Sequence, residues 1–157
     1  MPIDQAFKSI NDAGRFVESN KIRVKIRNQD DMLNVPEVPG VYWIETTMPE
    51  KEIFNPKIYK DKKRVTTPKG TKIIVQEKQN PYIIYNGTES NINRRLKQHL
   101  FKEGNEGTGK LGLEIHKGKW KEYEWYVFYM KIEDVPLRNA IEIWWRHNIG
   151  WPPFCKR

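Results

Sequence analysis

Residues 81–100 read PYIIYNGTESNINRRLKQHL, and this stretch predicts a strand followed directly by a helix. The run PYIIYNG at 81–87 is short and apolar and ends in Asn-Gly, a pair typical of strand ends and turns. The run SNINRRLKQHLFKE at 90–103 begins with residues that cap helices and then repeats an aliphatic side chain at every fourth position. A strand and an amphipathic helix in succession indicate a domain of mixed class.

Elements on either side of this stretch complete the expected order. The first is a helix whose apolar face includes Ile10 and Phe16, and the last is a helix capped by Asp134. The expected ranges are a helix at 3–19, strands at 21–27 and 40–45, a strand at 123–132 and a helix from 134 to about 150. Since no repeat or linker interrupts them, we expect one α+β domain over 1–157, with 1–35 as an N-terminal helix and strand extension.

A basic insert is expected at 47–80, between two of the strands. It contains KIYKDKKRVTT and TKIIVQE, which both have strand character, with Pro68, Lys69 and Gly70 between them. Proline and glycine at this place favour a tight turn, so the insert is expected to form a β-hairpin.

The charge balance bears on the partner. The chain of 157 residues has a net charge of +8 and an isoelectric point near 9.5, which suits a polyanion. The single cysteine, Cys155, excludes a disulfide within the chain and favours a reducing compartment. The sequence shows neither a secretory signal pattern nor an apolar run long enough to span a membrane, so we expect a cytoplasmic protein.

Arg95 and His99 are candidate site residues because a spacing of four places them on one helix face. A guanidinium there can bind a phosphate through two parallel donors, and an imidazole can orient a nucleophile. The alternative is a solvated basic face, since Arg94, Lys97 and Lys102 lie on the same expected helix.

Glu142 is a candidate metal ligand. It lies in the apolar run IEIWW, where a lone carboxylate is costly unless it is paired or bound to a cation. Mg²⁺ keeps several waters and needs only one or two carboxylates together with substrate phosphate. The alternative is an ion pair with Arg138 or Arg146, each one helical turn away.

Tyr42 and Tyr85 both lie on expected strands. Strand tyrosines often serve only in packing. A tyrosine acts as a base only when nearby positive charge lowers its pKa from about 10. The candidate arginine, histidine and metal would supply that charge.

Taken together, GVY at 40–42, YNG at 85–87, Arg95, His99 and Glu142 resemble the motifs of the GIY-YIG nuclease family. The spacing from the glycine to the arginine and on to the histidine is the most specific element of this resemblance. It implies a small three-stranded antiparallel sheet flanked by helices.

The resemblance also implies roles. Tyr42 would be the general base that activates water, and Arg95 would stabilise charge on the scissile phosphate. Glu142 would hold one divalent cation, Mg²⁺ or Mn²⁺. His99 and Tyr85 would support the nucleophile or the phosphate.

The chain departs from the family pattern in several places. Asn86 replaces the aliphatic residue of the second motif, and the two motifs lie further apart than usual. Cys155 lies about where the family has a C-terminal asparagine, and Asn148 is the other candidate for that place. Gly87 is expected to let the backbone turn tightly into the helix.

A compact member of this family with insertions is most similar to its Type II restriction endonucleases. That likeness implies double-stranded DNA as substrate and a homodimer with one active site for each strand. Major-groove or phosphate contacts are expected from residues of the insert and the last helix, namely Lys62, Lys63, Arg64, Lys69, Lys72 and Asn148. Two alternatives stay open: a phage or mobile-element nuclease of relaxed specificity, and an inactive DNA-binding module of the same fold.

Overall fold

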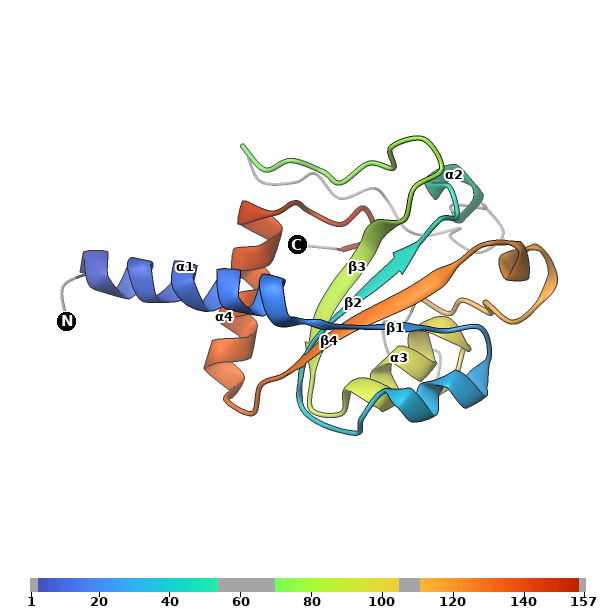
Figure 1. Cartoon of the computed structure of the whole chain (residues 1–157), viewed down its shortest axis with the longest axis horizontal. Helices are drawn as coiled ribbons and strands as arrows, with labels where there is room; N and C mark the ends of the chain where they lie inside the picture. The colour runs from blue at the N-terminus through green and yellow to red at the C-terminus, as the bar shows by residue number, and fades with distance from the viewer. Residues whose placement is uncertain (1–2, 54–69, 105–110, 156–157) are drawn as a thin grey trace.

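The computed structural model of the chain describes residues 3–53, 70–104 and 111–155. Within these ranges, four antiparallel strands form one sheet in the order β1-β4-β2-β3, with helices on both faces (Figure 1). The helices are α1 (Ile3–Asn20), η1 (Gln29–Asn34), α2 (Glu50–Ile53), α3 (Ile92–Leu100), η3 (Gly118–Glu122) and α4 (Val135–Asn148), where η marks a 3-10 helix. The strands are β1 (Ile22–Lys25), β2 (Gly40–Thr46), β3 (Tyr82–Glu89) and β4 (Trp125–Lys131). The domain is therefore α+β, as predicted.

Strand β2 lies inside the sheet, since it pairs with β3 on one side and with β4 on the other. Its side chains alternate between two cores. Val41 and Trp43 pack with residues of α1 and α4, whereas Tyr42 and Ile44 pack with residues of α3. Tyr42 is therefore buried in the core that α3 covers, where it is 2% exposed.

The sheet has four strands, whereas the family resemblance implied three. The additional strand is β1, whose residues Ile22 to Lys25 pair with Tyr129 to Tyr126 of β4. An unpaired edge of β4 would expose backbone donors and acceptors, and the alternating segment after α1 supplies their partners. The strand predicted at 21–27 is thus the edge strand of the sheet and not a separate extension of the domain.

Helix α1 packs on α4 through Gly14 and Val17, which lie four and seven residues after Ile10 and therefore on the same face of the helix. Phe16, which was expected on this face, lies off it and is 62% exposed. The indole of Trp144 lies so close to Gly14 that a Cβ atom there would be 2.3 Å from the ring. The missing side chain allows this approach, which hydrophobic periodicity does not take into account.

The capping residues predicted for α3 and α4 are confirmed. The side chain of Asn91 accepts a hydrogen bond from the Arg94 amide at 3.0 Å, and that of Asp134 accepts one from the Leu137 amide at 2.8 Å. Each cap satisfies a backbone donor that the first turn of a helix leaves unpaired.

The first expected strand of the basic hairpin lies at 57–67, outside the described residues. In the described part of the insert, Ile73 forms a parallel bridge with Trp151 of the C-terminal tail. The Ile74 amide donates to the Trp151 carbonyl at 2.9 Å, and the Trp151 amide donates to the Lys72 carbonyl at 2.8 Å. The strand predicted at 71–77 is therefore wrong, because this segment forms only an isolated bridge to the tail, a contact that local sequence patterns do not reveal. No helix in the described ranges is long and apolar enough to cross a membrane.

Candidate active site

Two neighbouring strands and one helix bring three aromatic side chains together. Tyr42 of β2 lies opposite Gly87 of β3, and Tyr85 lies two residues before that glycine, on the same face of the sheet. The two phenol rings stack with centroids 6.2 Å apart and planes inclined by 23°. The imidazole of His99, from α3, lies 4.7 Å from the Tyr85 ring and 5.7 Å from the Tyr42 ring.

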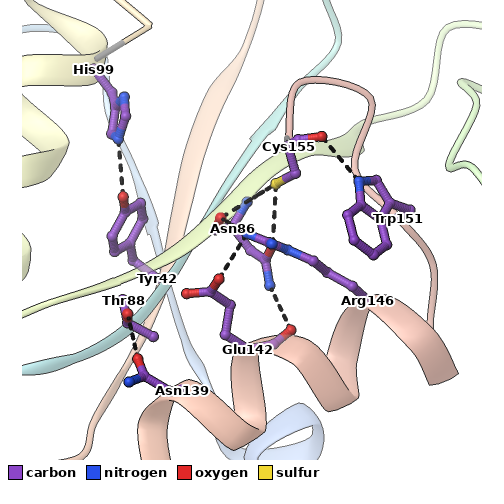
Figure 2. Close-up of polar contacts among 9 residues, drawn as sticks. All are labelled: Tyr42, Asn86, Thr88, His99, Asn139, Glu142, Arg146, Trp151 and Cys155. Atoms are coloured by element: carbon purple, nitrogen blue, oxygen red, sulfur yellow. Dashed lines mark hydrogen bonds and ion pairs between the residues drawn. The ribbon is translucent and has the colours of Figure 1, made fainter. Parts of the chain in front are cut away.

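His99 is the polar centre of this cluster and is fully buried. Its Nε2 lies 3.0 Å from the Tyr42 hydroxyl oxygen (Figure 2). Its Nδ1 accepts a hydrogen bond from the Leu111 backbone amide at 2.9 Å. Both ring nitrogens are thus engaged, which fixes the orientation of the ring toward Tyr42.

Arg95 lies one helical turn before His99, on the same side of α3. Its Nη1 donates to Gln98 Oε1 at 2.7 Å, and its side chain also hydrogen-bonds to Tyr42. The Tyr42 oxygen therefore interacts with both an imidazole and a guanidinium. The alternative of a purely solvated basic face is wrong for these two residues, because Arg95 is half-buried and His99 is fully buried.

Burial dominates the ionisation of both tyrosines. It raises the pKa of Tyr42 well above the usual value near 10, and the neighbouring Tyr85 raises it further. The charge and hydrogen bond of Arg95 act in the opposite direction without cancelling the effect of burial. The pKa of Tyr85 is also raised, by burial first and then by Cys155. In this structure, Tyr42 is thus a protonated phenol at neutral pH.

Glu142 belongs to a second polar cluster, where α4 meets β3. Arg146 Nη2 lies 2.9 Å from Glu142 Oε1, so one alternative read from the sequence, an ion pair with Arg146, is present. Arg146 also donates from Nε to Asn86 Oδ1 at 2.7 Å and from Nη2 to the Asn86 carbonyl at 3.0 Å. Its guanidinium lies 5.3 Å from the centroid of the Trp151 ring. Figure 2 shows Glu142 and Arg146 reaching from α4 toward Asn86.

The C-terminal tail closes this second cluster. The Phe154 amide donates to the Ile84 carbonyl at 3.1 Å, which holds the tail along β3. The Cys155 thiol is buried, accepts from the Asn86 amide at 3.2 Å and lies 3.3 Å from the Asn86 carbonyl. Asn148 is exposed, and its amide bonds back to the Trp144 carbonyl of its own helix at 2.8 Å. Of the two candidates for the family's C-terminal asparagine, only Cys155 lies in the cluster.

Tyr85 connects the two clusters electrostatically. The positive charges of Arg95 and Arg146 lower its pKa, and the carboxylate of Glu142 raises it. These charges come from different helices, α3 and α4, and act on one phenol. Of the five residues predicted for the site, Tyr42, Tyr85, Arg95 and His99 thus form one cluster, and Glu142 belongs to the second.

Glu142 offers a cation a limited set of donors. Its Oε1 is bound to Arg146, and its Oε2 has no partner within the described ranges. Across the same residues, no group of three or more His, Cys, Asp or Glu side chains is placed to hold a metal ion. A single carboxylate oxygen fits a hard cation such as Mg²⁺, which fills its other positions with waters and phosphate oxygens.

The predicted DNA contacts are mostly untested. Lys62, Lys63, Arg64 and Lys69 lie outside the described residues, while Lys72 and Asn148 are exposed. The clusters also contain residues beyond the predicted site, among them Arg146, Asn86 and Leu111. Asn86 stands out in the sequence as the polar centre of YNG. Leu111 acts through its backbone amide, which every residue except proline has, so no sequence signal could have identified it.

Comparison of the chain with family models, with curated proteins and with solved structures finds no match. The arrangement of the side chains is therefore the basis for a functional assignment.

Proposed function

We propose that this chain is a metal-dependent DNA endonuclease of the GIY-YIG type, which hydrolyses phosphodiester bonds. The observation that carries this proposal is the Tyr42 oxygen, which lies 3.0 Å from His99 Nε2 and is hydrogen-bonded by Arg95. A buried phenol that interacts with an imidazole and a guanidinium is an arrangement that favours transfer of a proton at that oxygen. The pairing of the GVY strand with the YNG strand, followed by the helix that carries Arg95 and His99, also supports the proposal.

In the proposed mechanism, Tyr42 accepts the proton of the attacking water. Because burial holds Tyr42 in the protonated form, it must first lose its own proton. The hydrogen bonds from Arg95 and His99 favour that loss, since each stabilises a phenolate oxygen.

Arg95 also has a role toward the substrate. Its guanidinium is suited to bind the scissile phosphate and to stabilise the negative charge that grows on its oxygens. Glu142 would hold Mg²⁺ or Mn²⁺ through Oε2, and the bound cation would polarise the phosphate and stabilise the leaving oxygen. Tyr85, stacked on Tyr42 and close to His99, keeps both rings in position.

Within the endonucleases, we propose a Type II restriction enzyme that acts on double-stranded DNA as a homodimer. This assignment rests on the net charge of +8 and the basic insert. A phage or mobile-element nuclease of relaxed specificity would share the same site and differ in the pattern of its products.

A DNA-binding module without catalysis is the second candidate. The ion pair between Glu142 and Arg146 favours it, because that pair competes with a metal for the carboxylate. Against it stands the Tyr42–His99–Arg95 arrangement. Burying these polar groups is costly, and binding alone does not require them.

Incubation of supercoiled plasmid with the chain, in Mg²⁺, Mn²⁺ or EDTA, tests the proposal. Wild type is compared with Glu142→Gln and Tyr42→Phe, and Glu122→Gln at an exposed position of η3 serves as the matched control. Discrete fragments that need metal, persist in the control and vanish in both site variants would support a restriction enzyme. A smear with the same dependence would support the relaxed nuclease. DNA binding without cleavage, by a folded protein in either metal, would support the binding module.

A further inference from the structure

The two hydrogen bonds of His99 determine where its proton lies. A backbone amide can only donate, so the Leu111 N–H at 2.9 Å requires Nδ1 to be an acceptor with a free lone pair. A neutral imidazole with an unprotonated Nδ1 carries its single hydrogen on Nε2. His99 is therefore the Nε2–H tautomer.

This tautomer sets the direction of the bond to Tyr42. Because Nε2 carries the hydrogen, it donates across the 3.0 Å separation and the Tyr42 oxygen accepts. The same nitrogen has no lone pair with which to take the phenol proton. Protonating Nδ1 instead would turn two N–H groups toward each other at Leu111, in a fully buried place. In this geometry, His99 is a donor to Tyr42 and not its base.

The Leu111 amide is held in place by the chain around it. The Leu113 amide donates to the His99 carbonyl at 2.7 Å, and the Ile115 amide donates to the Leu100 carbonyl at 3.1 Å. The side chains of Leu111, Leu113 and Ile115 are all buried in the core. Gly112 lies between Leu111 and Leu113 and has a φ of +67°. This backbone conformation, which glycine adopts readily, lets the amides of both leucines point toward His99.

We propose that Leu111 is a positioning residue, whose backbone amide fixes His99 as a hydrogen-bond donor to Tyr42. This inference rests on the proposed function, because it assigns the route of the Tyr42 proton at the same site. The phenol O–H bond breaks and its proton passes to solvent hydroxide, which becomes water. The resulting phenolate accepts the Nε2–H bond, and His99 keeps its own proton throughout. The phenolate then takes one proton from the attacking water and returns to the phenol.

The tautomer can be measured without any activity assay. In protein labelled with ¹⁵N-histidine, long-range proton–nitrogen correlation spectra at about pH 8 distinguish an Nε2–H ring from an Nδ1–H ring. The signals of His99 are assigned by their loss in His99→Gln, and His116 and His147 remain as internal references. An Nε2–H ring at His99 is the expected result. An Nδ1–H ring would overturn the proposal whether or not the chain cleaves DNA.

Two substitutions at His99 test the consequence for catalysis. In His99→Gln the side-chain amide nitrogen can still donate to Tyr42, whereas His99→Met keeps bulk and removes the donor. A hydrogen bond to a charged oxygen has a large effect, so the Gln variant is expected to cleave about tenfold to a hundredfold faster than the Met variant. The Met variant should also need a higher pH for its activity, since the phenolate has lost a donor.

The outcomes separate the two proposals. Equal loss of activity in folded Gln and Met variants would contradict the donor role and indicate that His99 transfers protons. Leu111→Pro, which removes the amide donor, should shift the tautomer signals; if it does not fold, the two His99 variants still decide. A wild-type chain that cleaves nothing but shows the Nε2–H ring would overturn the proposed function and leave the assignment of the proton intact.

Discussion

Gly87 of β3 lies directly opposite Tyr42 of β2, and a Cβ atom at Gly87 would lie 2.6 Å from the Tyr42 hydroxyl oxygen and 2.8 Å from its Cζ. The glycine thus leaves the space in which the phenol reaches His99. This differs from the expected role of Gly87 as a tight turn into α3, because β3 continues to Glu89 before the helix begins. The physical reason for glycine is the close approach of a side chain from the neighbouring strand.

Gly87→Ala is therefore expected to displace the Tyr42 ring. The ring has little freedom to move, because it stacks on Tyr85 and bonds to His99. Overpacking of this kind costs about 1–3 kcal/mol of unfolding free energy. DNA cleavage should fall about a hundredfold, because a small misplacement of a reacting group is sufficient for such a loss.

Urea unfolding and plasmid cleavage would measure the two effects. Ser90→Ala, at an exposed position after the same strand, is the matched control and should change neither. Unchanged cleavage by Gly87→Ala would mean that the position of Tyr42 does not matter to the reaction.

The strands and helices of the described residues follow closely from the sequence, because they depend on local patterns. The alternation in 40–46 and the aliphatic spacing in 92–100 lead to β2 and α3. The same periodicity places Ile10, Gly14 and Val17 on one face of α1, but it does not indicate that a glycine forms the contact with Trp144 or that Phe16 is exposed. The pairing of Ile73 with the tail joins residues far apart in the chain, and no local pattern indicates it.

The sequence predicts those features of the candidate site that depend on the type and spacing of the side chains. Spacing alone placed Arg95 and His99 on one face of a helix. For Glu142, the sequence left a choice between a cation and an ion pair, and the Arg146 contact at 2.9 Å supplies the ion pair. What the sequence could not give was the depth of burial of Tyr42, because burial depends on how β2 and α3 come together.

Arg146→Ala is expected to destabilise the fold strongly. The substitution leaves the Glu142 carboxylate and the Asn86 side chain without their guanidinium partner in a mostly buried place. Removing one partner of a buried ion pair costs about 3–5 kcal/mol. Lys121→Ala, at an exposed position, should cost almost nothing.

A double-mutant cycle with Glu142→Gln would identify the cause. Since the glutamine carries no charge, the loss caused by Arg146→Ala should be smaller in that background. Equal losses in both backgrounds would show that the contacts of Arg146 with Asn86 and Trp151, and not the ion pair, account for the stabilisation.

Stability should fall in alkaline solution because of Cys155. Burial raises the pKa of its thiol from near 9 to about 11 in the folded chain. Between these two values, the unfolded chain loses a proton that the folded chain keeps, so unfolding becomes easier as pH rises. The difference between the two pKa values corresponds to about 3 kcal/mol of unfolding free energy, lost progressively from about pH 9 to pH 11.

Cys155→Ser removes this titration and keeps a small polar group beside Asn86. Urea unfolding at about pH 8, 9 and 10 should therefore show a shallower loss of stability for the variant than for wild type. The buried tyrosines contribute in the same direction in both proteins and do not affect the comparison. If the unfolding free energies of wild type and Cys155→Ser fell equally with pH, the thiol would not be the titrating group.

Cleavage should become faster as pH rises above neutral. Tyr42 acts as a base only as a phenolate, and its pKa lies well above 10 in the free chain. The phenolate fraction, and with it the rate, should then increase about tenfold for each pH unit below that pKa. Tyr85→Phe should move this rise to lower pH, because Tyr85 is one of the groups that raise the pKa of Tyr42. Initial rates at saturating DNA, from about pH 7 to pH 9.5, give the profile, and circular dichroism confirms folding at each pH. A rate independent of pH in wild type would exclude Tyr42 as the group that accepts the proton of water.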